Sequence, residues 1–249
     1  MIVELKAELK KLFTVRSTYF IFAFVLVLMV FVAFFVSGWH IDKLDLLNPN
    51  TLANDIKGTA AAVSIFAALI ALLLFTNEYR YNTIMYSLTL SNNRNKVLLA
   101  KIVAASVLAV VFTLFFSAIS PVLSVLGIHA HHLKLVHQTL NYGNLLWRCL
   151  FFGWGYTMAG LVLGALIRNQ VGAIIVLLVG PDTVEGLLSL LLKKHVIYLP
   201  FSALHEVIGQ GQSYNTSISP LKGAFIFGGY LVVCWIVAWI LFLRRDATS

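Results

Sequence analysis

Charged residues are scarce in this sequence: they make up 11% of the 249 residues, whereas 60% of the residues are hydrophobic. An ordinary soluble domain carries about a quarter charged residues, so these charges are too few to cover a surface that faces water. The mean hydropathy of +0.90 agrees with this interpretation. The sequence therefore predicts an all-α integral membrane protein, and its length suits one domain of roughly six spans at about 20 residues each.

Several motifs of enzymes and metal proteins are missing. The two cysteines, Cys149 and Cys234, both lie in apolar runs, where they resemble small core residues more than a disulfide or metal pair. No phosphate-binding G-x-x-x-x-G-K-[ST] run occurs, and no serine, histidine and acid share a local catalytic signature. We therefore expect no catalytic residue, metal or cofactor in this chain. The first apolar run is also too long for a signal peptide and lacks a small-residue cleavage site after it.

The apolar segments divide the single domain, residues 1–249, into predicted spans. The first 18 residues alternate apolar and charged faces at helical spacing, which predicts a helix lying in the membrane interface; the alternative is a plain cytosolic start of the first span. Pro121 should kink or end the third span, and Gly180-Pro181 should end the fifth. The six spans are predicted at residues 19–38, 59–76, 102–126, 149–167, from 171 to about 180, and 223–243.

Lysine and arginine set the expected orientation. Six spans place both termini on one side of the membrane, and 11 of the 18 lysine and arginine residues fall on that side. Because cytoplasmic loops carry the excess of these residues, both termini are expected in the cytoplasm. This bias also accounts for the net charge of +8 without a nucleic-acid partner.

The polar segment at residues 77–96 separates the second and third spans. Glu78 lies at the end of the second span, where a carboxylate opposes the helix macrodipole, and Arg80 is its nearest expected partner. Ile84, Met85 and Leu88 recur at helical spacing after it. This pattern predicts a short amphipathic helix, which could be an ordinary interfacial loop or a docking helix for a cytoplasmic partner.

Four positions in and after this segment resemble a motif of the ABC-2 type ABC transporter permeases: Glu78, Thr83, Arg94 and Lys101. The sequence departs from the usual pattern where Asn82 and Ala100 replace glycines. The amphipathic N-terminus, the Tyr198-Leu199-Pro200-Phe201 run and the basic C-terminal Arg244-Arg245-Asp246 also resemble this family, so the likeness extends over the whole chain as topology.

The resemblance implies a permease subunit in a bacterial cell membrane, driven by a separate ATPase that binds ATP and Mg. In the family, such a permease works with two ATPase copies and with a second identical or homologous permease, among membrane lipids. Export of amphiphilic, peptide, lipid or drug-like substrates is expected. The residues that would contact the ATPase are Glu78, Arg80, Tyr81, Thr83, Ile84, Met85, Leu88, Arg94 and Lys101.

The region at residues 181–221 is expected to lie outside the cell. The resemblance favours a re-entrant hairpin there, with Asp182, Glu185 and Pro200 near an outer vestibule. The two acids could cap this hairpin or act directly in transport, because acids in apolar segments are functional candidates. Four histidines at positions 129, 131, 132 and 137 could bind zinc, but their spacing fits no ligand set and we expect them to be unliganded.

Two other functions remain open from the sequence. One is a non-transport immunity or scaffold protein that binds a toxin or partner through the outer hairpin. The other is a secondary transporter, which would place acids or arginines inside its spans; spans one, two, three and six contain none. Co-purification of an ATPase separates the permease from both alternatives.

Overall fold

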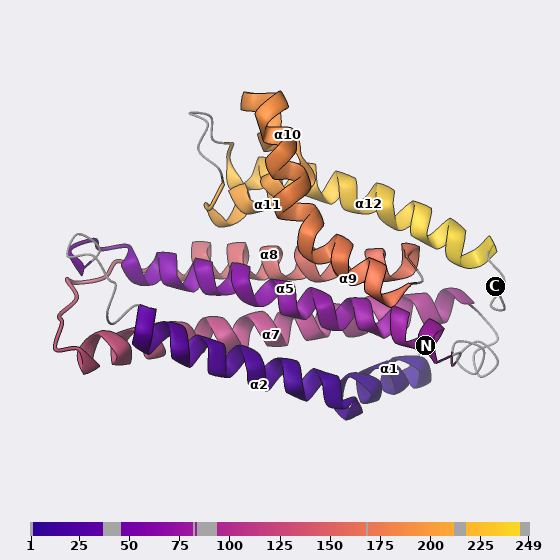
Figure 1. The fold of residues 1–249 in the computed structure, drawn as a ribbon, viewed down its shortest axis with the longest axis horizontal. Helices are drawn as coiled ribbons and strands as arrows, with labels where there is room; N and C mark the ends of the chain where they lie inside the picture. Colours follow the sequence, from indigo (N-terminus) through magenta and orange to yellow (C-terminus); the bar gives the residue numbers. More distant parts are fainter. Residues whose placement is uncertain are drawn as a thin grey trace.

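The computed structural model describes residues 2–36, 46–81, 83, 94–167, 169–211 and 218–244, except for the side chains of Val36, Asp182, Lys194 and Arg244. The regular elements in these ranges are all helical (Figure 1). Five helices are long and apolar enough to cross a membrane: Arg16–Phe35, Thr51–Arg80, Arg94–Ala130, Tyr142–Leu166 and Pro220–Leu243. The chain is thus a multi-pass membrane protein; the described residues contain five candidate spans, so the predicted count of six is not confirmed.

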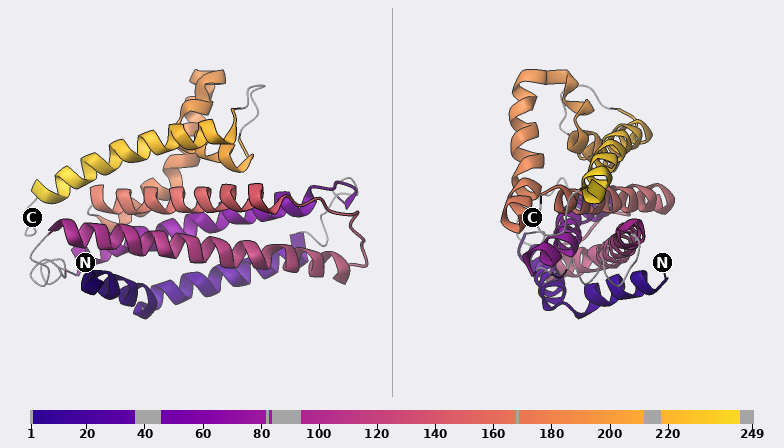
Figure 2. Two further views of the ribbon diagram at one scale, coloured as in Figure 1. Left: turned by 180° about the vertical axis from the view of Figure 1, so that it is seen from behind. Right: turned by 90° about the vertical axis from the view of Figure 1, so that its right-hand side faces the viewer.

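The N-terminal part forms two helices at an angle to each other, α1 (Ile2–Thr14) and α2 (Arg16–Phe31) (Figure 2). Val15 separates them with an extended backbone, φ −75° and ψ 122°. The last turns of the first span form a π-helix, η1 (Val32–Val36). This arrangement confirms that a helix precedes the first span.

Helices α5 (Thr51–Arg80) and α8 (Tyr142–Leu166) form the most extensive pair in the bundle. Two glycines of α8 permit their close approach: a Cβ atom on Gly160 would lie 2.3 Å from the Ala68 carbonyl oxygen, and one on Gly164 would lie 2.7 Å from that of Leu72. The spacing of Gly160 and Gly164, G-x-x-x-G, is therefore a helix-packing feature. Helix α7 (Arg94–Ala130) packs against both.

Two helix boundaries differ from the predicted ones. Helix α5 already begins at Thr51, so the polar residues 51–57 form its first turns instead of a loop. Helix α7 continues through Pro121 to Ala130. Proline removes one backbone donor but can be accommodated in a packed transmembrane helix whose neighbours satisfy the freed groups, so it does not end this one.

The C-terminal part folds over the bundle. Helix α9 (Gln170–Val179) has 10 residues and continues through a π-helix, η2 (Gly180–Val184), into α10 (Glu185–Leu192). Gly180-Pro181 therefore does not end the helix, because a π-helical segment carries it past the proline. The 3₁₀ helix η3 (Lys193–Tyr198) and α11 (Pro200–Ile208) return to the bundle, and α12 (Pro220–Arg244) lies beside α11 and α8 (Figures 1 and 2).

Candidate functional site

Four charged residues from three helices meet at the end of the bundle that holds the N-terminus. Glu8 and Lys11 come from α1, Glu78 from the last turn of α5, and Lys101 from the second turn of α7. Lys101 Nζ lies 3.0 Å from Glu8 Oε2 and 2.8 Å from Glu78 Oε1, and Lys11 Nζ lies 2.8 Å from Glu8 Oε1 and 2.6 Å from Glu78 Oε1. We call these four residues the ion-pair cluster.

Lys101 is the centre of the cluster. Its side chain is 0% exposed, and its ammonium group donates to Glu8, to Glu78 and to the backbone carbonyl of Leu74 at 3.0 Å. These three acceptors use all three donors of an ammonium group, and the nitrogen also lies 5.3 Å from the centre of the Phe75 ring. A buried charge is tolerated only when it is paired and hydrogen-bonded in this way.

The charges of the cluster balance, since two ammonium groups face two carboxylates that are 3% and 5% exposed. This explains the position of Glu78 at the C-terminal end of α5, where the macrodipole alone would disfavour it. The cluster therefore links α1, α5 and α7. Removing any one of its four residues would leave an uncompensated buried charge on the remaining ones.

Lys11 is the most exposed member, with 38% of its side chain accessible. Burial lowers the pKa of its ammonium group, but the carboxylates of Glu78 and Glu8 raise it by more. Its pKa therefore lies above the ordinary value, and Lys11 is charged at neutral pH.

The structure places the other residues predicted to contact an ATPase around the cluster. Arg80, the partner expected for Glu78, donates to Gln170 Oε1 at 3.0 Å and lies 5.5 Å from the Tyr81 ring. The ion pairs of Glu78 run to Lys11 and Lys101, which corrects that pairing. Ile84, Met85 and Leu88 lie outside the described residues.

The two ends of the polar segment are held in place by backbone groups. The Thr83 N–H donates to the Glu78 carbonyl at 2.9 Å. Arg94, the first residue of α7, donates to the Leu243 carbonyl at 3.2 Å. The guanidinium of Arg94 thus satisfies a carbonyl at the C-terminal end of α12, where cations are favoured.

Glu8 and Lys11 were not among the predicted site residues. In the sequence they belong only to the polar face of α1, and their partners lie 67 and 93 residues away. One signal was available, because Lys101 lies in an otherwise apolar run and needs an acid when that run is buried. Glu78 is one such acid. The other two members of the cluster, Glu8 and Lys11, come from α1.

A cavity of about 470 Å³ adjoins the cluster between α1, α2 and α5. We call it the inner cavity. Lys11 and Glu78 form its charged wall, while Ile70 and Leu73 belong to its apolar wall. Its remaining lining residues are Leu12, Val15, Ser17, Thr18, Leu74, Asn77, Tyr81 and Thr83.

The residues predicted near an outer vestibule lie apart from the cluster. Glu185 is buried and caps α11: its carboxylate accepts from the backbone N–H groups of Phe201 and Ser202 at 2.8 and 2.7 Å, and from the Ser202 hydroxyl at 2.6 Å. Pro200 occupies the first turn of α11, where its missing N–H costs nothing. The Asp182 side chain lies outside what the structure describes.

The histidine-rich segment has one ring contact that bears on the fold. A ring nitrogen of His131 lies 3.0 Å from the carbonyl oxygen of Phe34 in η1. Among the described residues, no three histidine, cysteine or acidic side chains lie close enough together to hold a metal ion.

Comparison with known proteins agrees with the helical membrane architecture. A family model described as "ABC-2 family transporter protein" matches residues 4–180, which extend from α1 to the start of η2 and include the whole ion-pair cluster. A search of curated proteins found no match. Since the family model covers well over half of the sequence, the chain belongs to the ABC-2 family of transporter proteins.

Proposed function

We propose that this chain is the permease subunit of an ATP-driven exporter and that a separate ABC ATPase binds its segment at residues 77–96. Membership of the ABC-2 family supports an ATPase partner in general. The observation that carries the finer proposal is the ion-pair cluster, because its members flank this segment. Glu78 precedes the segment in α5, and Lys101 follows it in α7. ATP and Mg bind to the ATPase, and this chain supplies no catalytic group.

The cluster would carry movement from the docked ATPase into the membrane. A force on residues 77–96 acts on the end of α5 and on the start of α7, which the Lys101–Glu78 pair holds together at 2.8 Å. The Lys101–Glu8 pair at 3.0 Å adds α1 to the same unit. Buried ion pairs tolerate little displacement, since stretching them exposes each charge to a medium of low dielectric. The three helices would therefore shift as one body.

Both termini would lie in the cytoplasm, on the same side as the cluster. The excess of lysine and arginine on that side supports this orientation. It places α11 and the Glu185 cap at the outer surface, where the cap stabilises a short helix by satisfying backbone N–H groups at its N-terminus.

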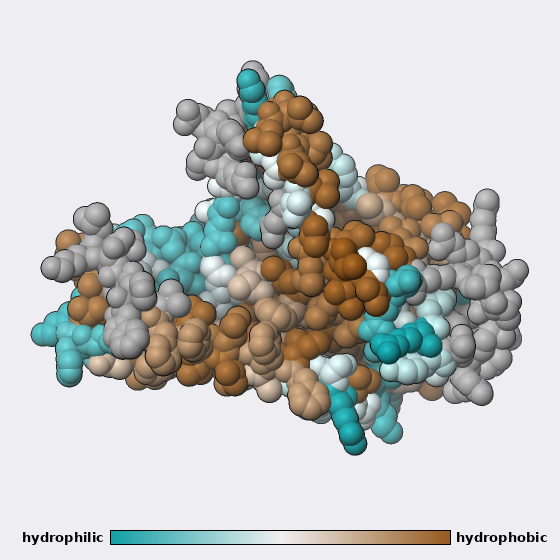
Figure 3. Space-filling model, in the orientation of Figure 1, coloured by the Kyte–Doolittle hydropathy of each residue, from teal (hydrophilic) through white to brown (hydrophobic). Residues whose placement is uncertain are grey.

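A second permease copy, identical or homologous, would complete the transporter. The rod formed by α9, η2 and α10 exposes a row of large apolar side chains, visible as brown surface in Figure 3. Lipid or a second permease can cover such a face, and we place the second permease there because the rod leaves the bundle. The most exposed side chains of this apolar row on the rod are Val171, Ile175, Val184, Leu187, Leu190 and Leu191.

Amphiphilic compounds are the proposed substrates. The inner cavity combines apolar side chains from α5 with the charged groups of Lys11 and Glu78. Such a lining accommodates a hydrocarbon part and a polar head group in one compartment.

Co-purification tests the proposal. The tagged permease is co-expressed with a candidate ABC ATPase from the same genome, and the ATPase recovered per permease is measured. The variant carrying Ile84→Asp and Met85→Asp should lose the ATPase, because charge on the proposed docking face opposes burial in a groove. Leu47→Asp, which charges an exposed apolar residue before α5, should keep it. An ATPase retained by the double aspartate variant, or absent from the wild type, would contradict the proposal.

A further inference from the structure

Helix α2 is held to the bundle at its two ends. At one end, Gly127 allows α7 to approach η1 closely: a Cβ atom at this position would lie 2.2 Å from the Ala33 carbonyl oxygen. The His131 ring contacts the neighbouring Phe34 carbonyl at 3.0 Å. At the other end, α1 is tied to α5 and α7 by the ion-pair cluster.

Aromatic side chains hold the middle of α2. Phe22 packs against Phe112 and Phe116 of α7, with ring centres 5.7 and 5.1 Å apart, and Phe24 lies 5.8 Å from Phe66 of α5. Phe66 lines a second cavity, while Ile70, one helical turn further along α5, lines the inner cavity. The Phe24–Phe66 contact therefore lies where the two cavities approach each other.

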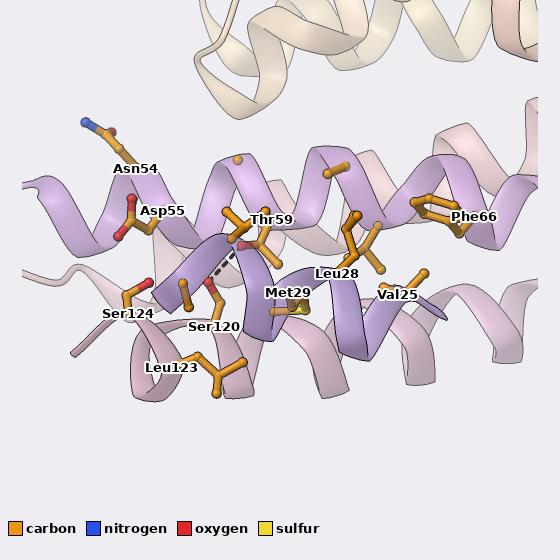
Figure 4. Close-up of a pocket in the computed structure, with 15 residues that line it drawn as sticks. Val25, Leu28, Met29, Asn54, Asp55, Thr59, Phe66, Ser120, Leu123 and Ser124 are labelled. Carbon is orange, nitrogen blue, oxygen red and sulfur yellow. Dashed lines mark hydrogen bonds between the residues drawn. The ribbon is translucent and has the colours of Figure 1, made fainter. Parts of the chain in front are cut away.

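This second cavity, which we call the outer cavity, has a volume of about 260 Å³ between α2, α5 and α7 (Figure 4). One end is polar: Figure 4 shows Asn54, Asp55 and Ser124 there, and beside them Thr59 and Ser120 joined by a 2.8 Å hydrogen bond. The other end is apolar, with Val25 and Phe66 among its walls.

The outer cavity is elongated along the helix axes. Asp55 and Phe66 are 11 residues apart on α5, which corresponds to about 16 Å at a rise of ~1.5 Å per residue. Asp55 is half-buried and is the only charged side chain among the described residues that line the cavity. A molecule that fills the cavity thus meets a carboxylate and hydroxyl groups at one end and hydrocarbon at the other.

We propose that the outer cavity binds an amphiphile with a cationic head group and a single hydrocarbon tail. The head group lies against Asp55, Thr59 and Ser124, and the tail extends toward Phe66. At about 260 Å³ the outer cavity is smaller than the roughly 300–1,000 Å³ of cavities that hold drug-sized ligands, so it has room for part of one hydrocarbon tail and not for a two-chain lipid. This inference rests on the proposed export function and names the chemistry of one of its binding sites.

The cavity can be reached from the surface of the chain. Ala62 lines it and is exposed, as is Asn54 at the polar end. Ala62 is also a favourable position for a blocking substitution, because it lines the cavity and is not buried in the core. Ala118 of α7 is exposed but does not line the cavity, which makes it a matched control.

Equilibrium binding to the permease alone tests this inference. The protein is placed in phosphatidylcholine nanodiscs without any ATPase, and binding of radiolabelled dodecyltrimethylammonium is measured after subtraction of its partition into empty nanodiscs. Dodecyl sulfate provides the same tail with an anionic head group. The wild type should bind the ammonium compound about two- to fivefold more tightly than the sulfate, since a partly exposed charge pair contributes up to this level.

Two substitutions in the cavity separate its charge from its shape. Asp55→Asn should abolish the preference for the ammonium compound, and Asp55→Glu should keep it. Ala62→Phe should remove binding of both compounds, while Ala118→Phe should leave binding unchanged. Preserved preference in Asp55→Asn, or wild-type binding by Ala62→Phe, would overturn the inference.

A second copy of the chain, if it covered the outer cavity in place of the amphiphile, would give a different outcome. If a second copy of the chain covered the cavity, Ala62→Cys in a Cys234→Ala background, which lacks the exposed native cysteine, would form a disulfide-linked dimer and the ammonium compound would not bind, which would overturn the inference. Because the assay contains no ATPase, a failure to bind the amphiphile leaves ATPase docking intact. Loss of docking in the co-purification assay likewise leaves amphiphile binding intact.

Discussion

Lys101→Met removes the buried cation at the centre of the ion-pair cluster and is the most informative perturbation of the fold. Glu8 and Glu78 then share only Lys11, which leaves one uncompensated negative charge among side chains that are 3–5% exposed. Removing one partner of a buried ion pair costs about 3–5 kcal/mol. For a chain of this size each kcal/mol lowers the midpoint of thermal unfolding by roughly 2–4 °C, so a decrease of roughly 6–20 °C is expected.

A double variant tests whether charge balance is the cause. Lys101→Met combined with Glu78→Gln leaves the Lys11–Glu8 pair at 2.8 Å as a neutral remainder. Its unfolding midpoint should recover most of the loss, with a coupling energy of up to about 3 kcal/mol between the two positions. Both are measured by thermal unfolding of the purified protein in detergent.

Lys96→Met is the matched control, because Lys96 lies five residues earlier on α7 and is exposed. Its effect should stay within about 0.5 kcal/mol. The reasoning is refuted if Lys101→Met loses less than about 1 kcal/mol, or if the double variant loses more than either single variant.

Three further predictions concern other parts of the molecule and are checked by the same unfolding assay. Glu185→Gln weakens the cap of α11 and should cost about 1–2 kcal/mol; no change would show that the cap adds nothing. Gly160→Leu places a side chain where a Cβ atom already lies 2.3 Å from the Ala68 carbonyl oxygen, so it should cost at least about 1–3 kcal/mol, and a neutral result would refute the close α5–α8 contact. The pKa of Lys11 is higher in the folded protein than in the unfolded chain. The contribution of its ion pairs to the free energy of unfolding is therefore fully present below the pKa of the unfolded chain and is lost as pH rises through the pKa of the folded protein. Wild-type stability should therefore fall above about pH 10, and Lys11→Met should lack this fall; equal pH profiles would contradict the ion pairs of Lys11.

The sequence predicted the helices well because each span needs a long apolar run. Five of these runs became helices of 20 to 37 residues. The end predicted for the fifth span was wrong, because the prediction took Gly180-Pro181 as a helix end, whereas η2 continues the helix past the proline. Local preferences could not show this, since the outcome depends on whether the surrounding structure accommodates a π-helical turn.

The candidate site was half predictable. Glu78 and Lys101 stood out as charges at the edges of apolar runs, and resemblance to the ABC-2 permeases drew attention to both. Their pairing with Glu8 and Lys11 was not predictable, because α1 reaches them only through the tertiary fold. Amphipathic periodicity predicts burial of the apolar face of α1, whereas Glu8 and Lys11 belong to its polar face. Arg80 was the nearest cation in sequence, but residues two positions apart on a helix do not face each other.

Transport by a reconstituted complex tests the central claim, which is that the ion-pair cluster couples a docked ATPase to the membrane helices. The permease and its ATPase are placed in proteoliposomes, and ATP-driven movement of labelled dodecyltrimethylammonium is measured. The variant carrying Lys101→Met and Glu78→Gln, whose charges balance but which lacks both pairs between Lys101 and the other helices, should bind the ATPase and lose transport. Transport at the wild-type rate in this variant, or transport without the ATPase, would contradict the account.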